Sequence, residues 1–257
     1  MNKTFKLIVV SFFGLSTAFC SAQSAFEQGV NYYQKRAEKH TGLKVDSTNI
    51  NLAINSFSRA LKIKNEQSFE YLLECFYYKG AFVESEKPKQ KQVWLTGKLL
   101  GEKAIKQYPK NKKILLWFIA NYSKYGEAQG VVASAKNGLA DKIKTYAEQL
   151  LALDPKFADG AAYKLLGVIN YKVPKIPLII SWPSKQKAEK YLIKALKENS
   201  KSVSNLYYYA EFLVEEKRDA EAKILLNKIV KTTPRDSYLI EDSYDINMAK
   251  KLFSKIK

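Results

Sequence analysis

The sequence predicts an all-α fold, a right-handed α-solenoid of about five helix pairs with one further helix at the C-terminus. The first observation behind this prediction is a four-residue pattern that recurs along the chain at offsets of four, three and five. The second is an apolar, aromatic-rich segment upstream of each copy. Offsets of four and three place side chains on one stripe of a helix, so each copy predicts a helix whose stripe packs against a neighbour.

The pattern combines small or apolar residues on the stripe with a final residue that favours a helix end. Small side chains let a neighbouring helix approach closely, and the final Asn, Ser or Pro is a stop signal. These copies predict the second helix of each pair. They are Ala53, Phe57, Ala60 and Asn65; Gly97, Gly101, Ala104 and Pro109; Ile143, Ala147, Leu150 and Pro155; Ala188, Leu192, Ala195 and Ser200; and Ala222, Leu226, Ile229 and Pro234.

The upstream segments predict the first helix of each pair. In chain order they read "FEQGVNYYQKRAEKH", "FEYLLECFYYKG", "ILLWFIANYSKYG", "GAAYKLLGVINY" and "NLYYYAEFLVEEKRD". An amphipathic stretch around "DINMAKKLFSKI" predicts the closing helix. Insertions near 81–92, 126–141 and 172–184 separate first from second helices, and "ESEKPKQK" and "PRDSYLIEDSYD" are expected to be solvated loops.

Over residues 25 to 234 the pattern resembles the tetratricopeptide repeat (TPR) family, whose members stack helix-turn-helix units of 34 residues. The matching residues are packing residues, so the resemblance implies architecture and not an activity.

A narrower resemblance covers roughly residues 110 to 230. There a Trp-containing helix, "LALDPKFADGAAYKLLGV", a Pro-containing insertion and "AEKYLIKALKENS" follow one another in an order similar to that of the T-component proteins of periplasmic TRAP transporters. The animal regulators of microtubule dynamics are more distantly similar. The T-component resemblance implies a periplasmic protein that forms an oligomer, assembles with a solute-binding protein, and lines a path for a small apolar ligand.

The first 22 residues predict a secretory signal peptide, with a positive start, an apolar run and cleavage after Ala22. The remaining 23–257 are expected to form a single helical repeat domain in the periplasm or outside the cell. Cys20 offers the alternative of an outer-membrane lipoprotein, although the preceding Phe19 differs from the Gly or Ala of the usual lipobox. Membrane contact is expected only if Cys20 is lipidated. After cleavage only Cys75 remains, so no intramolecular disulfide is expected.

The chain is strongly basic, with a formal net charge of +18 that falls to +16 when Lys3 and Lys6 are removed. Export argues against nucleic acid as the partner, and the lysines are spread through every segment. A solvated lysine-rich surface is the simplest interpretation; anionic lipid, glycan or an acidic protein are the alternative partners.

No residue pattern indicates catalysis. His40 is the only histidine and is expected to complement a helix C-terminus. Cys75 lies among apolar residues and is expected to be a buried thiol. One histidine and one mature cysteine cannot form a zinc site, and no carboxylate pair is placed for acid/base work. We therefore expect no enzyme, no metal and no cofactor.

Stacked helix pairs predict a binding function, because first helices line a concave surface. The candidate binding residues, one position past each packing stripe or in the 172–184 insertion, are Glu70, Glu74, Tyr77, Trp117, Asn121, Lys124, Lys164, Tyr171, Trp182, Tyr207 and Glu211.

The leading functional hypothesis is an exported scaffold that mediates protein–protein assembly, with a solute-binding protein as the most concrete partner and a homo-oligomer as a further expectation. The alternative is a carrier that holds a small apolar solute or lipid between the solenoid and the Pro-rich insertion. That insertion reads "VPKIPLIISWPS", and its prolines forbid a regular helix.

Overall fold

The computed structural model describes residues 23–130, 133–134 and 138–256. The predicted all-α fold class is confirmed, and the chain divides into two compact units, Met1–Pro109 (unit 1) and Lys110–Lys257 (unit 2). The predicted signal peptide and part of the 126–141 insertion lie outside the described residues. No helix among the described ranges is both long and apolar enough to cross a bilayer.

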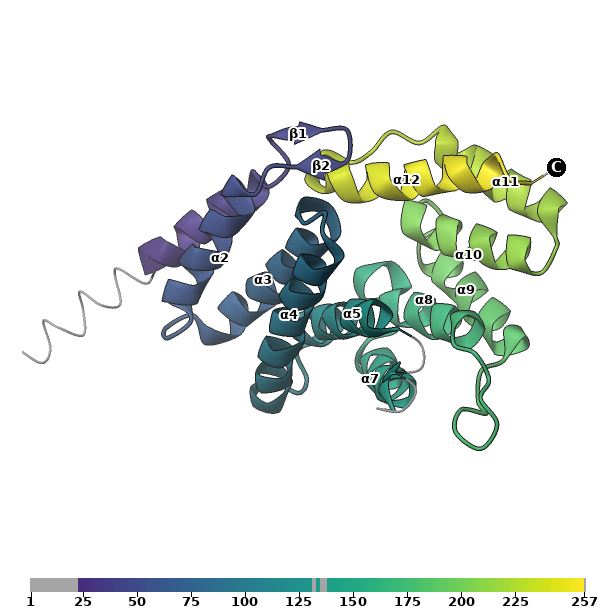
Figure 1. Ribbon diagram of the computed structural model, residues 1–257, viewed down its shortest axis with the longest axis horizontal. Helices are drawn as coiled ribbons and strands as arrows, with labels where there is room; N and C mark the ends of the chain where they lie inside the picture. The colour runs from purple at the N-terminus through teal and green to yellow at the C-terminus, as the bar shows by residue number, and fades with distance from the viewer. Residues whose placement is uncertain (1–22, 131–132, 135–137, 257) are drawn as a thin grey trace, which may run out of the picture. The chain divides into compact units, whose positions relative to one another are not determined.

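Unit 1 contains two predicted helix pairs and a short hairpin (Figure 1). A helix over 23–34 leads into the antiparallel strands β1 (His40–Thr41) and β2 (Lys44–Val45). The unit continues with α2 (Thr48–Ala60), α3 (Asn65–Tyr78), a π-helical turn η1 (Lys79–Val83) and α4 (Lys87–Gln107). Helix α3 packs against both α2 and α4.

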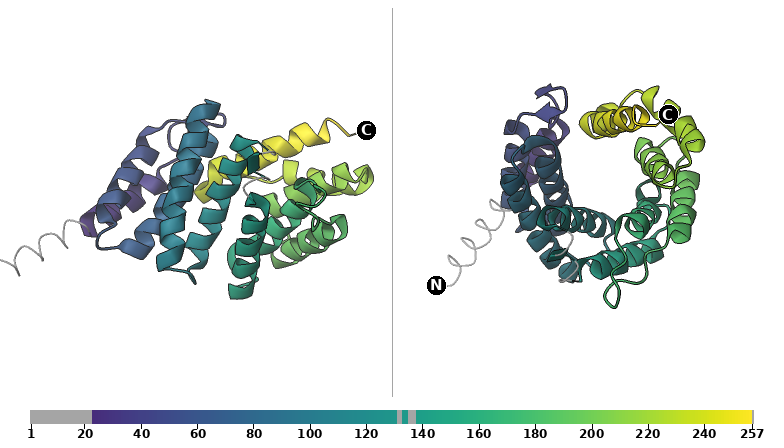
Figure 2. Two further views of the ribbon diagram at one scale, coloured as in Figure 1. Left: turned by 60° about the horizontal axis from the view of Figure 1, so that its bottom comes forward. Right: turned by 45° about the vertical axis from the view of Figure 1, so that its right-hand side comes forward.

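Unit 2 contains three further pairs and the closing helix. The pairs are α5 (Lys112–Gln129) with α7 (Leu139–Leu153), α8 (Phe157–Lys172) with α9 (Lys185–Glu198), and α10 (Val203–Glu215) with α11 (Asp219–Val230). A 3₁₀ turn η2 (Asp236–Tyr238) precedes α12 (Leu239–Phe253), which packs against α10 and α11 (Figures 1 and 2).

Three helices of unit 2 have N-terminal caps formed by side chains. The Asn111 side chain accepts a hydrogen bond from the Ile114 N–H at the start of α5 (2.9 Å), and the Ser184 hydroxyl accepts one from the Lys187 N–H at the start of α9 (3.3 Å). Ser202 caps α10 in the same way. Such caps satisfy backbone donors that have no partner within the helix, and they fix where each helix begins.

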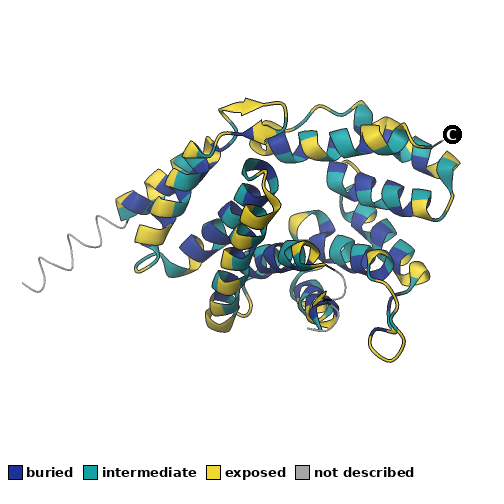
Figure 3. Ribbon diagram, viewed as in Figure 1, coloured by how far each residue is buried: buried dark blue, intermediate teal, exposed yellow. Residues whose placement is uncertain are grey.

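The alanines of the recurring pattern are fully buried in both units. Every alanine of the pattern has an exposed fraction of 0%: Ala53, Ala60, Ala104, Ala147, Ala188, Ala195 and Ala222. Buried residues follow the facing sides of the helices (Figure 3). The contacts leave no spare room, because a Cβ added to Gly167 on α8 would lie 2.7 Å from Leu192 Cγ on α9.

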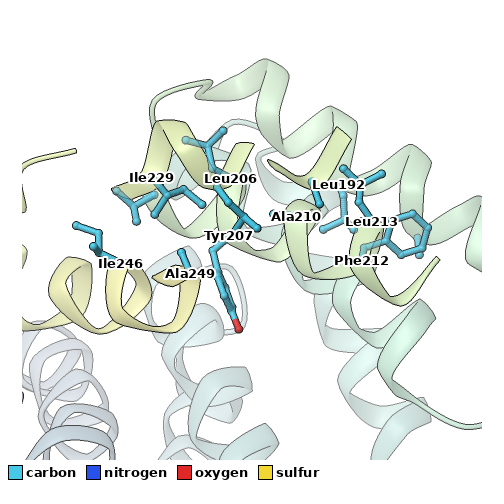
Figure 4. Close-up of a cluster of buried hydrophobic side chains, with 13 residues drawn as sticks. Leu192, Leu206, Tyr207, Ala210, Phe212, Leu213, Ile229, Ile246 and Ala249 are labelled. Carbon is cyan, nitrogen blue, oxygen red and sulfur yellow. The ribbon is translucent and has the colours of Figure 1, made fainter. Parts of the chain in front are cut away.

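Apolar side chains from α9, α10, α11 and α12 form one buried cluster (Figure 4). Leu192 comes from α9, Ala210 and Leu213 from α10, Ile229 from α11 and Ile246 from α12. The Tyr207 ring belongs to the same cluster, but its hydroxyl points away from the other labelled side chains. One residue thus connects the core of unit 2 to a polar surface.

The prediction that "ESEKPKQK" is a loop is wrong for its second half. Helix α4 begins at Lys87, with a proline in its first turn, so the last five of these residues are helical. Proline is favoured there because its missing N–H would have had no helical partner. The 81–92 insertion therefore consists mainly of extensions to two helices, η1 after α3 and the first turns of α4.

The prediction that "PRDSYLIEDSYD" is a solvated loop is wrong in the same way. Helix α12 begins at Leu239, and Asp242 is buried within it. The Arg235 guanidinium donates to both carboxylate oxygens of Asp242, at 2.7 and 2.8 Å. A buried carboxylate needs such a partner, and this fork holds the segment before α12 against the helix.

Substitution of a pattern alanine tests whether the helices pack this closely. Ala195→Leu should lower the free energy of unfolding by about 1–3 kcal/mol, because overpacking a tight contact forces side chains or backbone to shift. Ala195 lies next to Gly160, where an added Cβ would be 3.5 Å from the Ala195 Cα. Chemical denaturation measures the change. Ala152→Leu, at an exposed position of α7, is the matched control and should change stability little; equal effects of the two substitutions would contradict the packing account.

Candidate binding surface

One of the candidate residues on α3 lies in the core. Glu70 and Tyr77 are half-buried, whereas Glu74 is buried, hydrogen-bonded to the Tyr33 hydroxyl. Burial, and then the Glu74 charge, raise the pKa of Tyr33 well above its ordinary value. The buried Arg36 lies 4.4 Å from the centre of the Tyr33 ring. The assignment of Glu74 to a groove is therefore wrong, because this carboxylate belongs to a buried polar group that holds α3 to the N-terminal segment.

On α5, one of the three predicted binding residues lies in the core. Asn121 is fully buried and donates from Nδ2 to the Trp117 carbonyl at 2.8 Å, so it is not available to a partner. Trp117 and Lys124 are half-buried, and the Lys124 ammonium forms an ion pair with Glu127 at 2.8 Å. A helix-phase error of one position separates a groove residue from a core residue, which explains why Asn121 was misassigned.

The remaining candidates on helices lie together in unit 2. Tyr171 of α8 meets Glu211 of α10, and Lys164 of α8 and Tyr207 of α10 lie near Asp245 of α12. Tyr207 is buried at 6% exposure, so its ring is a core residue and not the predicted groove residue. We call this surface the α8–α10–α12 polar face; its members are Lys164, Tyr171, Lys172, Ser204, Tyr207, Tyr208, Glu211, Tyr244 and Asp245.

Glu211 holds one end of the polar face together. Its carboxylate accepts hydrogen bonds from the Tyr171 hydroxyl at 2.8 Å and from the Tyr207 hydroxyl at 3.2 Å. The Lys172 ammonium lies 3.1 Å from the same carboxylate and 2.7 Å from Glu215. Burial, reinforced by the Glu211 charge, raises the pKa of both tyrosines, so their hydroxyls remain donors throughout the physiological range.

Lys164, Ser204 and Asp245 form the other end. The Lys164 ammonium donates to the Ser204 hydroxyl at 2.8 Å, and Ser204 is hydrogen-bonded to the Asp245 carboxylate. The Lys164 ammonium also lies 5.9 Å from the centre of the Tyr208 ring. These contacts join α8, α10 and α12 through side chains, so α12 completes the surface as well as covering the core.

Burial shifts the pKa of two groups at this end in opposite senses. Burial lowers the pKa of Lys164, and the Asp245 and Asp159 charges oppose that shift. Burial raises the pKa of Asp245 to about 6, against the opposing effect of the Lys164 charge and with a further rise from Asp242. Both shifts disfavour the charged form, as expected for ionisable groups that lose contact with water.

Some members of the polar face were not identified from the sequence: Lys172, Ser204, Tyr208, Tyr244 and Asp245. Ser204, Tyr208 and Glu211 stand at offsets of four and three, which is the spacing of one helix face, so the polar stripe of α10 could have been found. Asp245 carried no such signal, because only the packing of α12 against α10 brings it there.

Trp182 lies apart from the polar face, in the 172–184 insertion. Its indole N–H donates to Asp141 on α7 at 2.6 Å, and the neighbouring Ile180 and Pro183 are buried. The insertion therefore folds back on unit 2 at its base. Its tip, Leu178 and Ile179, is exposed.

Other titratable groups show structural contacts. His40 begins strand β1, six residues past the end of the 23–34 helix, so its predicted role at a helix C-terminus is wrong; one of its ring nitrogens lies 2.7 Å from the Ala37 carbonyl. Cys75 is buried in α3, as expected. Among the described residues, no group of three or more His, Cys, Asp or Glu side chains is placed to hold a metal ion. The polar face offers hydrogen-bond donors, acceptors and both charge signs, which suits recognition of a polar surface or a chain segment.

No family model matches the sequence, and no curated protein sequence matches it. Among solved structures, the crystal structure of a thermophilic TPR protein from Thermus thermophilus is similar over 91% of this chain and 97% of that chain, with a TM-score of 0.60 and 14% identity. A likeness at this identity concerns the fold. It supports the predicted architecture of TPR-like helix pairs, and the T-component resemblance stays a prediction.

Asp245 generates a pH prediction. Because its pKa is raised from 3.8 to about 6 on folding, the folded state binds its proton more tightly than the unfolded state does. The stability from Asp245 is therefore complete below about pH 4 and is lost as the pH rises through about 6. Asp245→Asn cannot titrate, so the wild-type free energy of unfolding minus that of the variant should fall by about 2 kcal/mol between pH 4 and 7.

Urea denaturation at several pH values measures this difference. Asp236→Asn, at an exposed position, is the control for loss of one negative charge. A difference for Asp245→Asn that does not change with pH would contradict the assignment.

Proposed function

We propose that this protein is an exported scaffold that binds a segment of a partner protein on the α8–α10–α12 polar face. The observation that carries the proposal is the convergence of Tyr171, Tyr208 and Tyr244 with paired charges from three helices on one surface, which the buried Tyr207 supports from beneath. TPR-like helix pairs are well suited to this role, because stacked repeats create extended surfaces from the side chains of successive helices.

The chemistry of the face favours a protein partner over a small solute. Tyrosine supplies large contact area with a polar end at low cost in conformational entropy, and it is enriched at protein interfaces. Here Glu211 fixes two tyrosine hydroxyls, so Tyr171 and Tyr207 are ordered before a partner arrives. Preordered side chains lose less freedom on binding, which increases affinity.

In its finer form, the proposal is a periplasmic accessory of a TRAP transporter, with a solute-binding protein as its partner. The stretch that resembles T-components, roughly residues 110 to 230, falls within unit 2, the unit that carries the polar face. Copurification with a solute-binding protein would support this form. Copurification with an unrelated protein would support the scaffold proposal and rule out the transporter role.

The carrier alternative requires apolar side chains that face a space between the helices and the 172–184 insertion. Ile180 and Pro183 are instead buried against unit 2, and Leu178 and Ile179 face solvent. We therefore favour the scaffold. Native mass spectrometry separates the two, because a carrier retains a small molecule through purification.

Photo-crosslinking in the native host tests the binding face. A benzoylphenylalanine at position 208, on the polar face, should crosslink to a protein partner. The same group at position 224, which is 60% exposed on α11, serves as the control and should not. Equal crosslinking at both positions, or crosslinking at position 224 alone, would refute the assignment of the face.

Lys164→Glu provides an independent prediction for the same partner. Reversing this charge beside Asp245 should weaken retention of the crosslinked partner by at least about tenfold, because loss of a desolvated charge at an interface is costly. The matched control is Lys190→Glu, an exposed lysine on α9. Quantitative pull-down measures retention, and circular dichroism verifies that both variants are folded.

A further inference from the structure

The 172–184 insertion ends in an exposed apolar tip. Leu178 is 106% exposed and Ile179 58%, whereas Ile180, one residue further, is 3% exposed. The loop projects from unit 2 between α8 and α9 and lies on the opposite side of these helices from α12 in Figure 1. Figure 3 shows the exposed tip. The tip is therefore a surface separate from the polar face.

Hydrogen bonds hold the base of the tip. Ile176 and Ile180 form an antiparallel bridge with two backbone hydrogen bonds, of 2.9 and 2.8 Å, and the Ile179 N–H donates to the Ile176 carbonyl at 3.0 Å. The Trp182 indole N–H donates a hydrogen bond to the Asp141 carboxylate, and the Ser184 N–H donates one to the Asn170 side-chain oxygen at 3.2 Å. A loop with only an incidental apolar residue would not need this support.

Leu178 occupies a backbone conformation that disfavours it. Its φ is +65°, in the left-handed region, where glycine or asparagine is favoured and a bulky apolar residue is rare. Burial of the Leu178 side chain does not offset this conformational strain, because the side chain is fully exposed. Strain at an exposed apolar residue, with no gain in folding, indicates a contact outside the chain.

The charge around the tip indicates the chemistry of that contact. Residues 170–187 contain four lysines, Lys172, Lys175, Lys185 and Lys187, and no aspartate or glutamate. Lys172 and Lys185 are paired with glutamates of α10 and its C-terminal end, and Asp141 accepts the Trp182 N–H. The exposed Lys175 and Lys187 are the cations beside the tip. An apolar tip flanked by such cations complements an anionic surface that has an apolar interior.

We propose that this tip inserts into the interface of an anionic membrane, with Leu178 and Ile179 among the acyl chains and the lysines at the headgroups. Apolar side chains gain free energy in proportion to the carbons buried, and basic residues add attraction to anionic lipid. Three backbone N–H groups of the tip are already bonded within it, which lowers the cost of entering an apolar medium. This contact differs from an anchor at Cys20 and does not rest on the proposed function.

A lipid surface fits the tip better than a protein does. Stable protein interfaces bury about 800 Å² on each partner, far more than two side chains at the end of a loop provide. The other large exposed apolar residues of unit 2 lie singly, on α11, η2 and α12. An interfacial wedge needs no more than a few apolar side chains with basic residues behind them.

Vesicle sedimentation tests the proposal. The chain from Gln23 onward, which lacks the apolar run and Cys20, is mixed with vesicles of phosphatidylcholine alone or with phosphatidylglycerol added. We expect binding to the anionic vesicles, weakened by high salt because screening shortens the reach of the lysines. The double variant Leu178→Gly, Ile179→Ser should bind at least about tenfold more weakly, since most of the buried carbons are gone.

The double variant should keep the melting temperature of the wild type, because glycine suits the left-handed position. Ile224→Ser is the matched control for loss of one exposed apolar side chain and should bind vesicles like the wild type. Emission from Trp182 should shift to shorter wavelength on anionic vesicles, a shift that Trp182→Phe abolishes.

Either of two results would overturn the proposal: no binding of the wild type to anionic vesicles, or equal binding by the wild type and the double variant. If the double variant instead loses a crosslinked protein partner while its vesicle binding is unchanged, the tip is a protein contact and not a lipid contact.

Discussion

Close approach between neighbouring helices is the constraint on which the rest of the structure depends. Wherever the recurring pattern places an alanine, that alanine is fully buried, and between α8 and α9 a Cβ added to Gly167 would lie 2.7 Å from Leu192 Cγ. In unit 2 this closeness sets the positions of α8 and α10. The polar face then follows, because Tyr171 on α8 reaches Glu211 on α10 only if the helices are this near. Packing of small residues on one side of the helices therefore fixes the chemistry on the other side.

The helix pairs could be predicted because their signal is local. Offsets of four and three between small residues define a stripe within a single helix, and capping residues such as Ser184 and Ser202 mark its start. The start of α12 could not be predicted in this way. Asp242 is acidic and reads as a loop residue, and only the fork from Arg235 makes its burial favourable. A pairing partner seven residues away carries no periodic signal.

The candidate site was predicted in part, for the same reason. Lys164, Tyr171 and Glu211 were found because each lies one position past a packing stripe, and α8 and α10 keep that phase. On α3 and α5 the same rule pointed to Glu74 and Asn121, which are buried. Both are polar residues with partners inside the core, Tyr33 for Glu74 and the Trp117 carbonyl for Asn121. Sequence position cannot distinguish a solvated polar residue from one that is satisfied in the interior, because the partner comes from the fold.

Helix α12 also has a consequence for growth of the array. The last helix pair of a stacked array has an exposed apolar face, because that face would otherwise receive the next pair. If such faces bind other chains head to tail without closing a ring, they produce open filaments. Ile240, Ile246 and Ala249 of α12 are buried, whereas Lys250 and Lys251, later in the helix, are exposed. Helix α12 thus covers the apolar side of the α10–α11 pair and carries exposed lysines elsewhere on its surface, a pairing of apolar and charged residues that disfavours contact with another copy of the repeat there.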